Sequence, residues 1–131
     1  MNVATDRLCA NEPEIASKIM DGEAILINLQ TGAYYSLREA GALVWHLLCG
    51  HRTRSEMLQA VAAHYHAQSV AFESDLTEIL ALLVAENLVR VSDRSQAADP
   101  EEPAPDPTGA YQKPVLEKFT DMEELLALGV R

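Results

Sequence analysis

The stretch from Asp93 to Ala110 constrains this chain most, because it cannot join a folded core. It reads DRSQAADPEEPAPDPTGA, with four prolines and no large apolar side chain. Proline fixes the backbone and lacks an amide hydrogen, and a segment without apolar bulk cannot offset the entropy lost on folding. We therefore predict an acidic, proline-rich linker over 93–110. It separates a folded part from a C-terminal tail over 111–131.

The whole chain is acidic and has the size of one domain. Its 131 residues are 48% hydrophobic, and 20 acidic against 10 basic side chains give a net charge of −10. This length suits one folded domain, and the excess of negative charge repels phosphate backbones and anionic lipid surfaces. No apolar run approaches the roughly 20 residues of a spanning helix. We expect neither a nucleic-acid nor a membrane partner.

The two cysteines predict a reducing compartment. Cys9 and Cys49 are far apart, in neither a metal-ligand nor a redox spacing. The first residues, MNVATDRLCANE, lack the basic-then-apolar layout of a secretion signal. We therefore expect a cytoplasmic protein with free thiols, no metal and no cofactor.

Three short apolar segments predict an antiparallel sheet. They read IASKI, EAILINL and AYYSL, and the turn signals Asp21-Gly22 and Thr31-Gly32 separate them. Aliphatic β-branched and aromatic residues favour strands, and glycine after Asp or Thr favours a tight turn. The expected sheet has three strands. Residues 1–13, which precede it, are expected to form a flexible N-terminus.

Helices are expected after the sheet. Ser36–Glu39 and Thr53–Glu56 each have the S/T-x-x-E form of a capping box, and apolar residues at helical spacing follow both. A third apolar stripe predicts a helix from about 71 to 87, and residues 88–91 resemble a final short strand. The fold class is therefore α+β, and the order suits a small winged helix-turn-helix domain over 14–92.

No set of residues predicts catalysis. His64 and His66 are two residues apart on a helix, so they point in different directions and make no metal pair. Cys49 has a histidine two residues later but no nearby orienting Asp or Asn. Asp75 and Glu78 are interpreted as surface carboxylates without a basic companion. Phosphate-binding, dinucleotide-binding and nucleophile-elbow motifs are absent from the sequence, so we expect no enzyme.

The third predicted helix also argues against DNA binding, which winged domains often serve. From 72 to 87 it carries acidic side chains and neither Lys nor Arg. Placed in a DNA groove, this helix would set carboxylates against phosphates. A DNA-binding regulator is the least favoured function.

Two short motifs carry a family resemblance. Residues 28–37 read NLQTGAYYSL, and residues 41–45 read GALVW. Together they resemble the tG-x-YY-x-L … G-x-x-x-W pattern of the PqqD-like family, the recognition domains (RiPP recognition elements) of ribosomal-peptide modification systems. The resemblance covers about residues 14–91. It departs at Arg38, where the family often has Asn.

The resemblance implies a non-enzymatic peptide-binding adaptor. In that family a precursor's leader peptide lies extended along the third strand, between it and the third helix, for a modifying enzyme such as a protease, cyclase or radical enzyme. An open strand edge supplies the unpaired backbone groups for such an added strand. The groove residues expected here are Ala33, Tyr34, Tyr35, Ser36, Leu37, Asp75, Ile79, Leu82 and Glu86.

Leu82 is included because it lies off the apolar stripe of its helix. It would leave apolar surface beside the strand edge. Contact with the final strand or with another copy of the chain is the alternative role.

The tail carries a second resemblance. Its Y-x-x-P-x-L segment resembles the recognition motif in leader peptides of lasso-peptide precursors. Those leaders usually continue with Gly three or four residues after the Leu, whereas this chain has Phe119 and Thr120. Thr120–Glu123 is a further capping pattern. We expect a strand and then a short helix. The tail residues expected to fill the groove are Tyr111, Pro114, Leu116 and Phe119.

The tail leaves several arrangements open. Binding to its own domain would give an autoinhibited adaptor. Exchange between two copies would give a homodimer, and the alternative function is then a self-associating scaffold or regulatory protein. The tail could instead be the segment that a partner enzyme receives. An engineered fusion of reader and leader would also give this sequence.

Overall fold

The structure is a computed structural model that describes residues 2, 5–65, 70–99, 104–105 and 111–119. The short helix expected from Thr120 and the side chain of His66 lie outside these residues. Within them the elements are β1 (Leu8–Ala10), β2 (Ile15–Met20), β3 (Glu23–Asn28), β4 (Tyr34–Arg38), α1 (Ala40–Cys49), α2 (Arg54–Tyr65), α3 (Val70–Ala85), β5 (Val89–Val91) and β6 (Val115–Phe119). The predicted order from β2 to β5 is confirmed.

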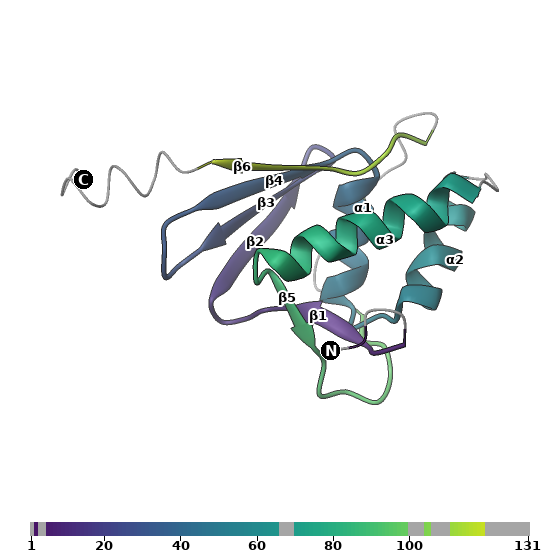
Figure 1. The fold of residues 1–131 in the computed structure, drawn as a ribbon, viewed down its shortest axis with the longest axis horizontal. Coiled ribbons are helices and arrows are strands. Elements are labelled where there is room, and N and C mark those ends of the chain that lie inside the picture. Colours follow the sequence, from purple (N-terminus) through teal and green to yellow (C-terminus); the bar gives the residue numbers. More distant parts are fainter. Residues whose placement is uncertain (1, 3–4, 66–69, 100–103, 106–110, 120–131) are drawn as a thin grey trace.

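The main sheet is antiparallel, in the order β2-β3-β4-β6 (Figure 1). Asp21 and Gly22 both have positive φ, 54° and 76°, which is the backbone of a two-residue hairpin turn between β2 and β3. The Asn28 side-chain oxygen accepts hydrogen bonds from the amides of Gln30 and Thr31 at 2.8 and 3.1 Å, which shapes the next turn. Over the described residues this sheet has four strands rather than the predicted three, because β6 adds to the edge of β4.

The helices cover one face of this sheet (Figure 1). Alternate residues of β3 and β4, among them Leu26, Tyr35 and Leu37, are buried against them. Trp45 of α1 is fully buried, and its indole N–H donates to Ser17 Oγ of β2 at 2.9 Å. The core therefore lies between α1, α2, α3 and the inner face of the sheet.

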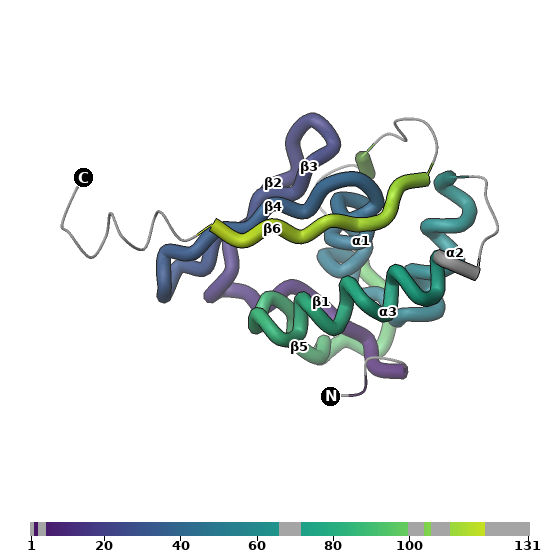
Figure 2. Tube along the Cα trace, turned by 45° about the horizontal axis from the view of Figure 1, so that its top comes forward, coloured from purple at the N-terminus to yellow at the C-terminus, as the bar shows by residue number. Residues whose placement is uncertain are grey.

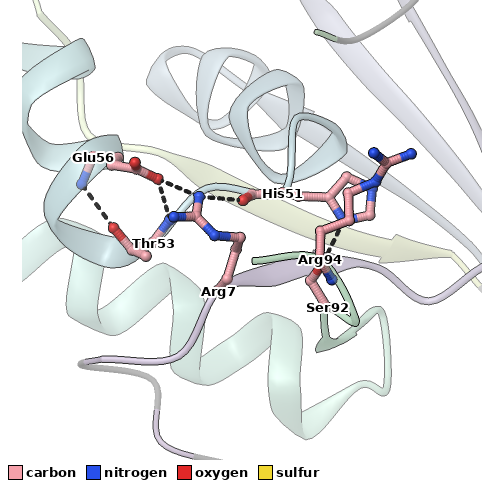
Figure 3. Close-up of polar contacts among 6 residues, drawn as sticks. All are labelled: Arg7, His51, Thr53, Glu56, Ser92 and Arg94. Carbon is pink, nitrogen blue, oxygen red and sulfur yellow. Dashed lines mark hydrogen bonds and ion pairs between the residues drawn. The ribbon is translucent and has the colours of Figure 1, made fainter. Parts of the chain in front are cut away.

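One of the two capping boxes expected before helices is confirmed. At the start of α2, the Glu56 amide donates to Thr53 Oγ1 at 3.2 Å, and the Thr53 amide donates to Glu56 Oε1 at 2.9 Å (Figure 3). The prediction of a capping box at Ser36–Glu39 is wrong. Ser36 belongs to β4 and donates to Glu23 across the sheet, and α1 starts after Glu39 without a side-chain cap. The bond to Glu23 in the neighbouring strand therefore takes the Ser36 hydroxyl that the capping pattern would have used.

The prediction of a flexible N-terminus over 1–13 is wrong for its last part. Leu8–Ala10 forms β1, which is buried and pairs with β5 in a separate two-stranded sheet. The linker prediction also needs correction near its start, because the Ala98 amide donates to the Gly50 carbonyl at 2.8 Å, at the end of α1. Residues 93–99 therefore contact the domain.

A polar network joins the residue before β1 to the start of α2 and to the segment after β5 (Figure 3). One guanidinium nitrogen of Arg7 lies 2.7 Å from Glu56 Oε1 and 2.8 Å from the His51 carbonyl. The His51 ring Nδ1 lies 2.6 Å from Ser92 Oγ. Burial lowers the pKa of His51, so its ring is neutral at pH 7. The network holds three segments distant in sequence together.

The capping box makes stability depend on pH. The Thr53 amide and then the Arg7 guanidinium lower the pKa of Glu56 below its ordinary value of 4.5. A lowered carboxyl pKa stabilises the folded state above the ordinary pKa, and this contribution is lost as pH falls through the folded pKa. Wild type should therefore exceed the Glu56→Gln variant in free energy of unfolding at pH 7, and this difference should shrink as the pH falls below the ordinary pKa of 4.5 and through the lower pKa of the folded state.

Urea unfolding between pH 7 and pH 3 measures this difference. Glu73→Gln is the matched control, because Glu73 is an exposed carboxylate on α3. A wild-type advantage over Glu56→Gln that stays constant across this range would contradict the assignment.

Candidate functional site

The outer edge of β4 is occupied by the tail. Tyr34–Arg38 pairs antiparallel with Val115–Phe119, with Tyr34 opposite Phe119 and Arg38 opposite Val115. Figure 2 shows β6 running between β4 and α3. The predicted strand edge and the predicted tail strand are thus brought together. Ala33 is the exception, because it precedes β4 and its carbonyl accepts from Asn28 within the turn.

Alternate residues of β6 point to opposite faces of the sheet. Leu116 lies opposite Leu37 and packs against the buried core. Phe119 stacks on Tyr34 with ring centroids 4.8 Å apart. Because Phe119 is three residues from Leu116, this stack lies on the outer face, away from the helices. Leu116 therefore lies in the groove, and Phe119 lies on the back of the sheet.

Tyr111 fills an apolar pocket formed by α1, α2 and α3. Its ring centroid lies 4.3 Å from that of Phe72 and 5.4 Å from that of Tyr65, both at steep interplanar angles. Only about 10 Å³ of this pocket is left unfilled. The hydroxyl donates to Asp75 at 2.8 Å, and burial together with this carboxylate raises the pKa of Tyr111. The hydroxyl therefore stays protonated and remains a donor at neutral pH.

Pro114 is buried over the start of α1. A Cβ atom added at Gly41 would lie 3.6 Å from Pro114 Cβ and 3.1 Å from Leu37 Cδ2. The Ala40 amide also points to the Gln112 carbonyl at 3.4 Å. The glycine of the GALVW segment thus keeps the space in which the strand, helix and proline meet.

Three carboxylates contact the tail, two from α3 and one from the residue that follows its end, and we call Asp75, Glu78 and Glu86 the acidic row. Besides the Tyr111 bond, Glu78 pairs with Lys113 at 2.8 Å and Glu86 pairs with Lys118 at 3.1 Å. The interpretation of Asp75 and Glu78 as carboxylates without a companion is therefore wrong. Lys118 lowers the pKa of Glu86, and Glu78 raises the pKa of Lys113, so the Glu86 carboxylate and the Lys113 ammonium are both charged at pH 7.

The remaining predicted groove residues differ in their placement. The Tyr35 hydroxyl donates to Glu86 at 3.0 Å, so β4 is hydrogen-bonded to the residue that follows the end of α3. Ile79 is 2% exposed and belongs to the core against which Tyr111 and Leu116 pack. Leu82 is 46% exposed on α3. Ser36 is buried on the outer side, bonded to Glu23, and so lies away from the groove.

Sequence reasoning missed several residues of this site: Glu78, Tyr65, Phe72, Gly41, Lys113 and Lys118. The sequence does contain a signal for the charged residues of this site. At about 100° per residue, positions 75, 78 and 86 fall on one side of a helix. The tail carries two lysines that could have been matched to this acidic side.

A larger cavity, of about 380 Å³, lies near β2, the end of α1 and residues 94–99. Its lining includes His46, Cys49 and His51. Within the described residues no group of three or more His, Cys, Asp or Glu side chains could hold a metal ion. No described helix is long and apolar enough to cross a membrane.

Comparison with known proteins identifies the family. Residues 23–89, about half of the chain, match the family model described as "Coenzyme PQQ synthesis protein D (PqqD)". The chain belongs to the PqqD family. The resemblance found in the sequence is therefore confirmed, whereas the leader-like motif of the tail stays a prediction.

A solved structure is also similar to this chain. It is "TbiB1 in Complex with the TbiA(beta) Leader Peptide", with 29% sequence identity and a TM-score of 0.57. The match covers 63% of this chain and 96% of that one. No curated protein matches. Nearly the whole of TbiB1 therefore aligns with this chain, whereas more than a third of this chain lies outside the match.

Proposed function

We propose that this PqqD-family chain is a non-enzymatic adaptor that binds the leader peptide of a precursor for a RiPP-modifying enzyme. The leader adds as a strand to β4 and places side chains between β4 and α3. One observation carries the proposal. An extended segment, β6, is paired with the outer edge of β4 and anchored by Tyr111 in the helical pocket.

Two further facts support the adaptor. The solved relative TbiB1 is described as a complex with a leader peptide. The contacts at the β4 edge suit a generic extended peptide, because backbone pairing needs no particular side chains and the pocket needs only one aromatic anchor. We also propose the winged helix-turn-helix classification and, since Cys9 and Cys49 are not joined in a disulfide, a cytoplasmic location.

In this proposal the tail is an internal ligand. Its Tyr111, Pro114 and Leu116 take the positions in which a separate leader with a Y-x-x-P-x-L segment would bind. A leader must then displace the tail. The alternative keeps the same contacts but exchanges tails between copies, which would make the chain a self-associating scaffold.

Titration of the isotopically labelled full chain with a synthetic Y-x-x-P-x-L leader peptide tests the proposal by NMR. Because the peptide replaces β6, the amides of Val115–Phe119 should move toward disordered shifts, while those of Tyr34–Arg38 and Asp75–Glu86 change in place. A peptide with alanine at its Tyr, Pro and Leu positions is the control. Amide shifts confined to other parts of the chain would contradict leader binding at β4.

A further inference from the structure

The acidic row and the tail residues that contact it follow each other in the same order along the chain. Going from the N- to the C-terminal end of α3, Asp75, Glu78 and Glu86 meet Tyr111, Lys113 and Lys118 in order. Lys118 Nζ also lies 5.9 Å from the centre of the Tyr35 ring, which gives this cation a second favourable contact.

The spacing of these pairs selects one register. Glu78 and Glu86 are eight residues apart, about 12 Å at the rise of a helix, and Lys113 and Lys118 are five residues apart, up to about 16 Å in an extended chain. Flexible lysine side chains absorb the difference. Lys113 precedes β6, so strand alternation applies to Lys118: a slip of one residue would turn Lys118 to the outer face, and a slip of two would move it about 7 Å. Either slip breaks the ion pair between Lys118 and Glu86.

On the other face of the sheet the charges are reversed, with a carboxylate on the tail and a cation on the domain. Glu117, next to Lys118, pairs with Arg38 of β4. Neighbouring residues of β6 therefore carry opposite charges, and each faces its complement. A cation in place of Glu117 would be repelled by Arg38, and an anion in place of Lys113 or Lys118 would be repelled by the acidic row.

We infer that the acidic row, with Arg38, selects the class of peptide that the groove accepts. This inference rests on the proposed function. The preferred ligand has an anchoring Tyr, a cation two residues later, a carboxylate six residues later and a second cation seven residues later. Backbone pairing holds any extended peptide, and the charges fix its register and discriminate among candidates.

Both tail ion pairs are partly exposed, with side chains 33–56% accessible, so each contributes modestly. Loss of one such pair costs about two- to fivefold in affinity, and reversing a charge adds repulsion to that loss. The discrimination should shrink in 1 M salt, where the screening length is about 3 Å.

Peptide binding to the full chain tests the inference. Tyr111→Ala with Leu116→Ala in the chain releases the tail, and the probe is a fluorescent nonapeptide with the sequence of residues 111–119. Introducing Lys113→Glu into the probe should weaken its binding about fivefold or more. In a chain that also carries Glu78→Lys, the altered probe should bind more tightly than the native one.

Glu73→Lys is the matched control, because it makes the same charge change on α3 about 160° around the helix from Asp75. It should leave the preference for the native probe intact. Equal affinity for both probes in every chain would overturn the charge selection while groove binding stands. Failure of both probes to bind would overturn the proposed function as well.

The unreleased chain gives a second measurement that needs no tail substitution at Tyr111. Hydrogen exchange of the β6 amides reports how often the tail leaves the groove. Glu78→Lys and Lys113→Glu should each lower protection of β6 severalfold, and the two together should restore most of it. Additive losses in the double variant would contradict a direct pair.

Discussion

Substituting Tyr111→Ala together with Leu116→Ala is expected to tighten the binding of a separate leader peptide by up to about a thousandfold. Because the Ala98 amide is bonded to the Gly50 carbonyl, residues 100–110 are the tether; a flexible chain of this length has a typical end separation of about 18 Å, which gives a tethered tail an effective concentration of about 1 mM. If the isolated tail binds with a Kd of about 1 μM, the tail-bound state is favoured over the open groove by about a thousandfold. This ratio corresponds to about 4 kcal/mol.

The two substitutions are large enough to remove this occupancy. Burial of each apolar body is worth about 1.5–3 kcal/mol, so the pair removes about 3–6 kcal/mol. Tyr111 also loses the hydrogen bond to Asp75. Isothermal titration with a Y-x-x-P-x-L leader peptide measures the change in Kd.

Val115→Ala is the matched control for the released tail. Val115 lies in the same strand but is 37% exposed and opposite Arg38, so its truncation should leave the leader Kd nearly unchanged. Equal leader affinity in wild type and the double variant would show that the tail does not compete. Light scattering on the same samples separates the arrangements. Binding within one chain keeps both proteins monomeric, whereas exchange makes only the wild type dimeric.

The regular elements could be predicted because their signals are local. The Asp21-Gly22 pair specifies a hairpin wherever it falls between two apolar segments. The box at Thr53–Glu56 needs only four consecutive residues to satisfy the first amides of α2. Turn and cap chemistry of this kind can be read without knowing the tertiary structure.

The failures came from contacts between distant residues. β1 has three residues, and its partner Val89–Val91 lies about eighty positions later, so no local pattern marks either as paired. Ser36 has the right spacing for a cap but is taken by Glu23 across the sheet. The same distance hid the partner of Glu78, because Lys113 meets it only after the tail has folded back.

The candidate site was predicted best where it depends on backbone. The resemblance to the PqqD-like family implies a peptide-binding strand edge at the YY-x-L segment, and the tail strand follows from a proline-anchored apolar segment. The pocket around Tyr111 depends on Phe72 and Tyr65 from two helices. Their joint position is fixed by helix packing, which the periodicity of either helix leaves undetermined.

Trp45→Ala is expected to destabilise the folded domain by about 3–5 kcal/mol. The side chain is fully buried in α1, and its removal leaves a cavity and takes the indole donor from Ser17. Domains of this size have total stabilities of about 5–15 kcal/mol, so this loss is a large share of the whole. Urea unfolding followed by circular dichroism measures it.

Two further variants separate packing from the hydrogen bond. Trp45→Phe keeps most of the ring and loses the donor, so its cost should be clearly smaller, because Ser17 is exposed and water can replace the indole N–H. Leu82→Ala is the surface control, since Leu82 is 46% exposed and its truncation should cost under about 1 kcal/mol. If Trp45→Ala cost no more than Leu82→Ala, α1 would not be packed on β2 as the structure has it. The groove beside β4, whose inner wall begins at α1, would then lack its support.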